Sequence, residues 1–242
     1  MKIICDLHTH TIASGHYTTD TLTMIARAAK DKGLEYLGVT DHTKGIPNAA
    51  KDDYFINLKT LSPKKLFGVN MLYGAEVNIA DEFGHVDLSE DILKKLDYAI
   101  ASLHEEVFLP HCESANTNAI LNAMDNKYVN IIGHPENGAY PVNFSLICKK
   151  AKDTNTIIEL NTESIRKDSY RGDQSLLAKA LMRECKKYDC YVSLGSDSHG
   201  QKRIGDLSYG VLLLEEIGVN PNNVVNTNID LFKRIIDKKR IK

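Results

Sequence analysis

Apolar and polar positions follow a regular rhythm along the chain: a short apolar run, a polar loop, then a segment whose apolar residues recur every three or four positions. The short runs are typical of buried strands, and the periodic segments are typical of amphipathic helices. Seven strands are predicted, at residues 3–8, 36–40, 71–75, 98–103, 129–133, 156–161 and 190–195. Helices are predicted at residues 21–32, 89–96, 117–124, 143–152, 174–188, 211–217 and 229–241, while 47–67 is expected to be a loop or irregular helix.

Strands that alternate with helices favour a parallel sheet, and seven of them close naturally into a barrel. Periodicity alone leaves an open, doubly wound sheet as the alternative. No low-complexity segment, linker or repeat interrupts the 242 residues, a normal size for one α/β barrel. We therefore expect a single α/β domain over residues 1–242.

Composition and charge limit which binding partners and which cellular compartment are expected. The formal net charge is −2, which does not suggest a nucleic-acid-binding surface, and no apolar run approaches the roughly 20 residues of a membrane span. The first residues lack the pattern of a signal peptide. The five cysteines form no Cys-x-x-Cys pair, which fits reduced thiols better than a disulfide framework. We expect a soluble cytoplasmic protein.

Candidate chemistry begins at the end of the first strand, with Asp6-Leu7-His8-Thr9-His10. Residues two apart in a strand share a face, so His8 and His10 point the same way and can bind one metal ion. Such a pair alone is a weak signal, because two surface histidines at a strand end would look the same.

The other strand ends repeat the pattern. The metal-competent side chains at or just after strand ends are His8, His10, His16, His42, Glu76, His104, His134, Asp197 and His199. They include seven of the nine histidines in the chain, and the carboxyl ends of parallel strands form one face. Imidazole and carboxylate suit Zn²⁺, Mn²⁺ and Fe²⁺. Nine ligands are more than one tetrahedral ion can bind, but they are enough for two or three ions. A carboxylate such as Glu76 would then bridge two of the ions.

These motifs resemble one known family. The matching stretches are Asp6-Leu7-His8-Thr9-His10 with His16, Thr40-Asp41-His42, Gly74-Ala75-Glu76, Leu103-His104, Gly133-His134-Pro135 and Gly195-Ser196-Asp197-Ser198-His199. In order and spacing they resemble the PHP (polymerase and histidinol phosphatase) family, most of all its stand-alone bacterial phosphatases with three zinc ions. The resemblance implies a distorted (β/α)₇ barrel.

It also implies a ligand assignment. One metal would be bound by His8, His10, Glu76 and Asp197, a second by Glu76, His104 and His134, and a third by His16, His42 and His199. The implied cofactors are three divalent ions, zinc first, with manganese or iron as alternatives that the ligands do not separate. The implied catalyst is a hydroxide bound by the metals of His8, His10, Glu76, Asp197, His104 and His134, which attacks a phosphomonoester.

Further polar residues are weaker candidates. Asn161 ends the sixth strand, and it, Arg166, Arg171 and Lys44 are candidates for contacting a phosphorylated substrate, with solvated surface charges as the alternative for the cations. Asp6 and Asp41 are candidates for orienting a ligand imidazole or for plain strand-end hydrogen bonds. His85 and His111 are expected to be surface residues.

The predicted function is hydrolysis of a small phosphomonoester, without nucleic-acid or membrane partners; the sequence leaves a homo-oligomer open. One alternative is a phosphatase specific for histidinol phosphate in histidine biosynthesis. An amidohydrolase-like metal hydrolase is a second, although His104 and Asn161 stand where that class uses a bridging group and a histidine. A nuclease-type module and a non-catalytic metal store are the remaining alternatives.

Overall fold

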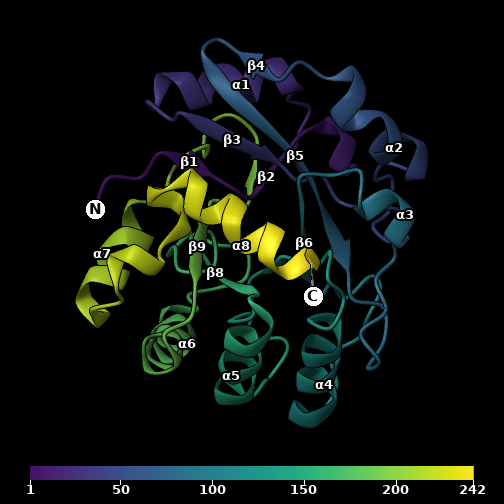
Figure 1. Ribbon diagram of the computed structural model, residues 1–242. Helices are drawn as coiled ribbons and strands as arrows, with labels where there is room; N and C mark the ends of the chain where they lie inside the picture. The colour runs from purple at the N-terminus through teal and green to yellow at the C-terminus, as the bar shows by residue number, and fades with distance from the viewer. Residues whose placement is uncertain (242) are drawn as a thin grey trace.

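The computed structural model describes residues 1–241, and its core is a nearly closed barrel of seven parallel strands (Figure 1). The strands pair in the order β1 (Cys5–Asp6), β3 (Tyr36–Val39), β5 (Val69–Asn78), β6 (Tyr98–Ser102), β7 (Ile131–Ile132), β8 (Ile157–Asn161) and β9 (Val192–Gly195). The short β4 (Lys65–Leu66) pairs antiparallel with β5. The predicted α/β barrel is therefore confirmed.

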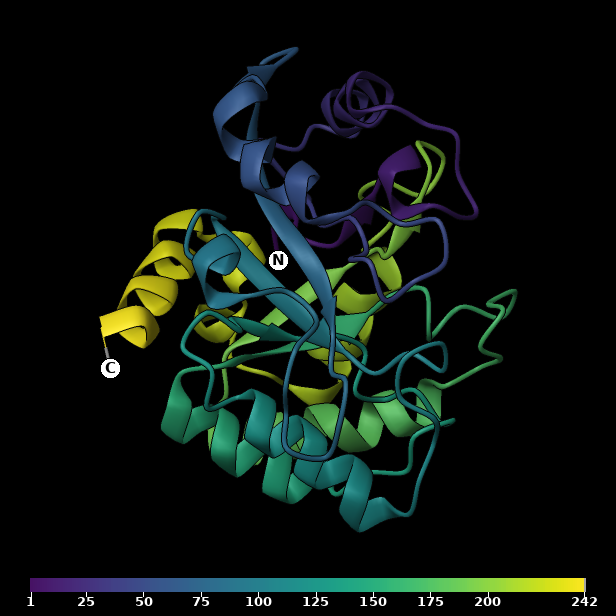
Figure 2. The same ribbon diagram turned by 90° about the vertical axis from the view of Figure 1, so that its right-hand side faces the viewer.

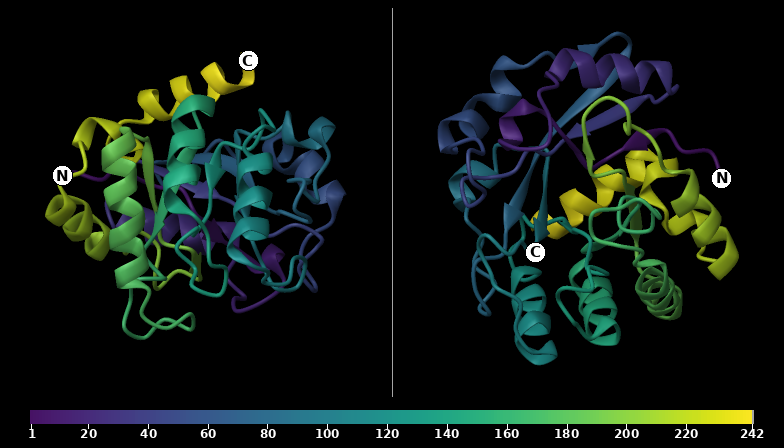
Figure 3. Two further views of the ribbon diagram at one scale, coloured as in Figure 1. Left: turned by 90° about the horizontal axis from the view of Figure 1, so that it is seen from below. Right: turned by 180° about the vertical axis from the view of Figure 1, so that it is seen from behind.

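Helices surround the sheet. They are α1 (Leu22–Asp31), α2 (Asp52–Leu61), α3 (Glu90–Leu93), α4 (Glu113–Ala123), α5 (Phe144–Thr154), α6 (Ser175–Tyr188), α7 (Ser208–Ile217) and α8 (Ile229–Ile241). Three 3₁₀ turns lie at η1 (Ile12–Ser14), η2 (Pro221–Asn223) and η3 (Val225–Thr227). In Figure 3, α4, α5 and α6 stand side by side on the outside of the barrel. None of the helices within residues 1–241 has the length and apolar character needed to cross a membrane.

Two apolar clusters divide the core. The larger lies between the sheet and the outer helices, and the smaller fills the barrel and continues into α8 through Phe232, Ile235 and Ile236. The helix α8 therefore closes the end of the barrel where the strands begin. Figure 2 shows α8 at one end and the loops that follow the strands at the other. The end at which the strands finish is therefore the candidate location of the active site.

The two edge strands, β1 and β9, meet at a seam that other groups close. The side chain of Asn226 accepts from the backbone N–H of Leu194 at 2.7 Å and donates to the carbonyls of Cys5 at 3.0 Å and Leu194 at 2.8 Å. At the opposite end, β2 (Thr9–His10) pairs in parallel with β10 (Ser198–His199). The N-terminal and C-terminal parts of the barrel thus meet at the predicted metal ligands.

Several predicted boundaries were wrong. Glu76 lies inside β5, which continues to Asn78, because Val77 is also buried and extends the strand beyond the predicted end at residue 75. The helix α4 begins at Glu113, four residues before the predicted start at Thr117, because polar Asn116 hid its first turn from the apolar pattern. The segment 47–67 contains the regular helix α2 and the strand β4.

Candidate metal centre

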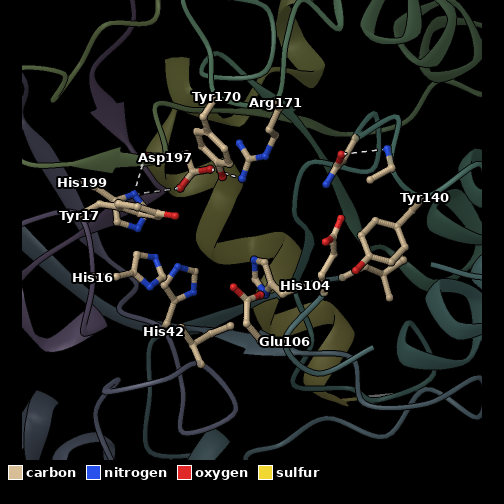
Figure 4. A pocket seen from close by; sticks show the side chains of 15 residues that line it. His16, Tyr17, His42, His104, Glu106, Tyr140, Tyr170, Arg171, Asp197 and His199 are labelled. Carbon is tan, nitrogen blue, oxygen red and sulfur yellow. Dashed lines mark hydrogen bonds and ion pairs between the residues drawn. The ribbon is translucent and has the colours of Figure 1, made fainter. Parts of the chain in front are cut away.

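All nine predicted ligands lie at the end of the barrel where the strands finish. Five of them, His16, His42, His104, Asp197 and His199, line one cavity and face it in Figure 4. His8, His10, Glu76 and His134 lie deeper and are buried. The structure thus brings together residues from the first tenth of the chain and from beyond residue 195, as predicted for a shared rim.

Glu76 lies at the centre of this cluster, and its two carboxylate oxygens face different histidines. Oε2 lies 3.2 Å from Nε2 of His8, 3.5 Å from Nε2 of His10 and 2.9 Å from Nδ1 of His42. Oε1 lies 2.9 Å from Nε2 of His134 and 3.4 Å from Nε2 of His104. A carboxylate with ligand atoms on both sides has the geometry needed to bridge two metal ions.

Ligand atoms converge in three overlapping groups, each close enough to hold an ion. The groups are His8, His10, Glu76 and Asp197; His42, Glu76 and His104; and His10, His42 and His199. The first is the set predicted for one metal. Two predicted ligands border the other groups instead of belonging to them: His134 hydrogen-bonds Glu76, and the His16 ring lies 5.0 Å from the ring of His199.

The ligand atoms themselves fit cations. Nε2 of His8, His10 and His199, Nδ1 of His42 and Oε2 of Glu76 are buried without a hydrogen-bond partner among the described residues, despite the short contacts to Glu76. A buried polar atom left without a partner costs about 1–3 kcal/mol, so several converging on one place indicate a missing positive group. Soft-to-intermediate divalent ions accept this mixture of imidazole nitrogen and carboxylate oxygen.

The pKa shifts of most of the predicted ligands favour the protonation state that can bind a cation. Burial lowers the pKa of His42 to about 4, so its imidazole is neutral near pH 7 and keeps a free lone pair. Burial alone would raise the pKa of Glu76, but the surrounding histidines, His8 foremost, hold it well below its usual value. His8 is the exception: burial opposes its charge, yet the carboxylates of Glu159, Glu76 and Asp197 raise its pKa well above 6.5. An ion at this position would displace that proton.

An imidazole that binds a metal through one nitrogen also needs a hydrogen-bond partner for the other nitrogen, because that contact fixes the tautomer and the orientation of the ring. Nδ1 of His10 contacts Oγ of Ser14 at 2.9 Å, and Nδ1 of His104 contacts the side-chain oxygen of Asn78 at 2.7 Å. Asp41 accepts from the same Ser14 hydroxyl at 2.8 Å. Asp41 thus orients the predicted ligand His10 through Ser14, which matches one of the two roles expected for it from the sequence.

Sequence reasoning missed Glu159, which holds His8. Its Oε1 lies 2.7 Å from Nδ1 of His8, and its Oε2 accepts from the backbone N–H of His134 at 2.8 Å. A Cβ at Gly195 would lie 2.0 Å from Glu159 Oε1, so this carboxylate needs glycine on the adjacent strand. The available signal was an acidic residue inside the apolar strand Ile157–Asn161, in the one strand without a predicted ligand.

Backbone conformation is unusual at two of the nine positions. His134 has φ = 30° and Asp197 has φ = 51°, in the left-handed region that non-glycine residues rarely adopt. Asp6 supports the second of these turns: its carboxylate accepts from the backbone N–H groups of Ser196 at 3.2 Å and Gly205 at 2.8 Å. Asp6 therefore fixes the loop that carries Asp197, and the strand-end hydrogen-bond interpretation describes it better than contact with an imidazole.

The cavity above the cluster has a volume of about 330 Å³. Arg171 reaches it from the loop after β8 (Figure 4); its Nη2 donates to Asp197 Oδ2 at 2.9 Å, and its buried Nη1 has no partner among the described residues. Tyr17, Tyr140 and Tyr170 contribute aromatic surface, and the acidic Glu105 and Glu106 also line the cavity. The cavity therefore combines a guanidinium group, predicted metal ligands, acidic groups and aromatic surface.

The other candidate substrate contacts lie elsewhere. Asn161 is buried beneath the cluster and donates to Glu159 and to Asp197, each at 3.2 Å. Arg166 pairs with Asp168, and Lys44 pairs with Asp52 at 3.0 Å; both border surface depressions separate from the cavity. His85 is exposed and pairs with Asp81, and His111 is also exposed, both as expected.

Fold and site together define a class: an α/β barrel whose strands carry, at their carboxyl ends, a cluster of histidines and carboxylates that could bind metal ions. The chain belongs to the PHP domain family, which it matches over residues 6–199. It is 46% identical over 228 residues to a probable phosphatase of Clostridium novyi, covering 94% of this chain and 92% of that protein. A probable phosphatase of Thermoanaerobacter is 40% identical over 243 residues, covering 100% of this chain and 98% of that protein.

A solved structure shares the fold. Histidinol phosphate phosphatase from Lactococcus lactis, in complex with zinc, L-histidinol and phosphate, superposes with a TM-score of 0.66 at 19% identity. The match covers 89% of this chain and 94% of that chain. It supports the barrel, and it shows that zinc and a phosphate bind to a protein of this fold.

Proposed function

We propose that this protein is a metal-dependent phosphomonoester hydrolase with three divalent ions, zinc first and manganese or iron as alternatives. The observation that carries the proposal is the cluster of nine histidine and carboxylate residues at the floor of a cavity into which Arg171 points. The names of the relatives support the reaction class. The cavity volume of about 330 Å³ suits a small metabolite.

The ligand assignment keeps the sets expected from the sequence. His8, His10, Glu76 and Asp197 would bind one ion, Glu76, His104 and His134 a second, and His16, His42 and His199 a third. When bound, the ions would supply a hydroxide at neutral pH and neutralise charge on the phosphate oxygens. Glu76 supports this arrangement because its two oxygens face separate sets of imidazoles.

The chain's own residues position the substrate. Arg171 lines the cavity, its buried Nη1 has no hydrogen-bond partner among the described residues, and Asp197 fixes its planar group, so we assign this guanidinium to bind the phosphate oxygens. Asn161 contributes indirectly by donating to Asp197. The remaining part of the substrate would lie against Tyr17, Tyr140 and Tyr170. Histidinol phosphate is one candidate, since L-histidinol and phosphate are bound in the Lactococcus lactis protein.

The test combines metal analysis with a panel of phosphomonoesters, including histidinol phosphate, nucleoside monophosphates and sugar phosphates. Protein purified without chelator should contain close to three transition-metal ions per chain, and hydrolysis should disappear on chelation and return with added metal. A reproducible content of one ion or fewer in active protein would contradict the three-metal arrangement. Activity that survives complete metal removal would contradict the proposed function itself.

The stereochemistry at phosphorus tests whether water attacks the substrate directly or a phosphorylated enzyme forms first. Direct attack by water inverts the configuration at phosphorus, whereas a phosphorylated enzyme intermediate inverts it twice. A chiral thiophosphate ester turned over in isotopically labelled water should give inversion. Net retention would exclude direct attack even if the ligands are assigned correctly.

A further inference from the structure

A second group of metal-competent side chains lies far from the histidine cluster, among the outer helices. The Sγ atoms of Cys148 in α5, Cys185 in α6 and Cys190 just before β9 lie within 4.8 Å of one another. Those of Cys148 and Cys185 are 3.6 Å apart. All three residues are at most 1% exposed. Three of the five cysteines thus meet at one buried place, and Cys148 lies 37 residues before Cys185 in the sequence.

Two structural devices bring the thiols together. The helix α6 ends at Tyr188, and Asp189 reverses the chain with φ = 54°, so that the Cys190 N–H bonds the Cys185 carbonyl at 2.9 Å. The helix α5 packs alongside α6 and contributes Cys148 (Figure 3). The Cys190 thiol lies 3.2 Å from the Cys148 carbonyl. The arrangement is therefore fixed by the backbone of two segments, α5 and the end of α6 with the turn that follows it.

A positive charge is fixed beside the cluster. Lys152 lies one helical turn beyond Cys148, and its ammonium donates to the carbonyl of Asp189 at 2.7 Å and to its carboxylate at 2.8 Å. This contact ties α5 to the turn that carries Cys190. The ammonium therefore lies near the sulfurs as one half of an ion pair, whose other half is the carboxylate of Asp189.

The number of donors decides which metal fits. Within residues 1–241, no further histidine, cysteine, aspartate or glutamate atom completes this group, so it offers three sulfurs. Structural zinc sites are almost always four-coordinate, whereas thiolates select soft ions such as Cu(I), which accepts three sulfurs in a plane. Sulfurs about 2.3 Å from a central ion in that plane lie about 4 Å apart. The observed separations of 3.6 Å and below 4.8 Å agree with this spacing.

We propose that Cys148, Cys185 and Cys190 form a second metal site, which binds one soft monovalent ion of the Cu(I) type through three sulfurs, independently of the histidine cluster. Binding involves no change of oxidation state: the ion enters as Cu(I), three S–Cu bonds form, and the thiol protons pass to solvent. The ion would tie α5, α6 and the start of β9 to one another.

The test uses the full-length zinc-loaded protein, reduced and kept free of oxygen, and Cu(I) supplied as its acetonitrile complex. One equivalent should bind with a sulfur-to-copper charge-transfer band in the ultraviolet, and X-ray absorption at the copper edge should show three sulfur neighbours. The melting temperature should rise, since an ion that binds only the folded state stabilises it. Copper with only nitrogen and oxygen neighbours would overturn the proposal.

Variants separate the cluster from other thiols. Cys185→Ser and, as a second variant should the first fold poorly, Cys148→Ala should each lose the copper equivalent. Cys112→Ser is the matched control, because Cys112 is exposed and lies outside the cluster, and it should bind copper like the parent. Undiminished copper–sulfur binding in either cluster variant would refute the site. A Cys148–Cys185 disulfide that forms in place of copper binding, detected by mass, would also refute it.

Discussion

Replacing Glu159 with glutamine should weaken metal binding at His8, although Glu159 is not itself a predicted ligand. Its carboxylate accepts from Nδ1–H of His8 at 2.7 Å and from the N–H of His134 at 2.8 Å. A glutamine side chain has one oxygen and one NH₂ group, so it can accept only one of the two contacts. If NH₂ faces His8, Nδ1 must accept, and the proton moves to Nε2, the atom that would bind the metal. If NH₂ faces His134 instead, two donors meet.

The expected loss of metal affinity in Glu159→Gln can be estimated from other metal sites. Removing the group that orients a ligand histidine typically costs 10–100-fold in metal affinity or activity, about 1.4–2.7 kcal/mol. Since Glu159 supports two of the nine predicted ligands, His8 and His134, we expect the upper part of that range. The loss should fall mainly on the ions bound by His8 and His134.

The assay is competition for zinc against a chelator of known affinity, with phosphatase turnover measured at saturating metal. Glu184→Gln is a suitable control, because Glu184 is a half-buried residue of α6 that lies outside the histidine cluster and pairs with Lys187. Glu159→Gln should need more zinc for half-maximal activity, and the control should match the parent. Equal zinc affinity in Glu159→Gln and the parent would refute the orienting role.

Three further predictions concern the same region. Glu76→Gln should lose turnover far more completely than His85→Ala, because a neutral amide bridges two cations poorly; near-parental turnover with metals retained would contradict the bridge. Chelation should lower the melting temperature measured by calorimetry, and an unchanged transition would show that the ions do not stabilise the fold. Burial, aided by Glu159, raises the pKa of Glu136 to about 8, so this one group should lower stability by about 1.4 kcal/mol per unit as pH rises from the unfolded value near 4.5 to 8. Buried histidines such as His42 act in the opposite direction, so the measurement is the difference in slope between the metal-free parent and Glu136→Gln in urea unfolding; parallel slopes would contradict the prediction.

The barrel could be predicted from the spacing of apolar residues along the chain, and the cluster from the position of polar residues at the strand ends. His8 and His10 alternate correctly on one face, and polar residues close successive apolar runs, which places them on a common rim. Glu76 was recognised because it directly follows the predicted end of its strand at residue 75, although the strand continues beyond it. Glu159 lies inside its apolar run and was therefore missed by a search for residues at strand ends.

Side-chain directions in loops could not be predicted, because no periodicity governs them. Arg166 and Arg171 stand five residues apart in one loop and read alike in sequence, yet Arg171 enters the cavity while Arg166 pairs with Asp168. The role of Asn226 was equally hidden. It depends on where the chain returns after α7, and the side chain of an asparagine in a turn usually bonds only to the backbone of the same turn.

The seam of the barrel has a consequence for the order of events during synthesis. The chain leaves the ribosome N-terminus first, so His8 and His10 emerge long before their partners Asp197 and His199. The N–H of Asp197 bonds the carbonyl of His8, and Asn226 joins the two edges, only when these last segments are available. A nascent chain that has reached β8 therefore carries most of the histidines but no complete first ligand set. Loading of the first and third proposed ions, which need Asp197 and His199, would be a late step, and these ions would mark a chain whose two edge strands have met.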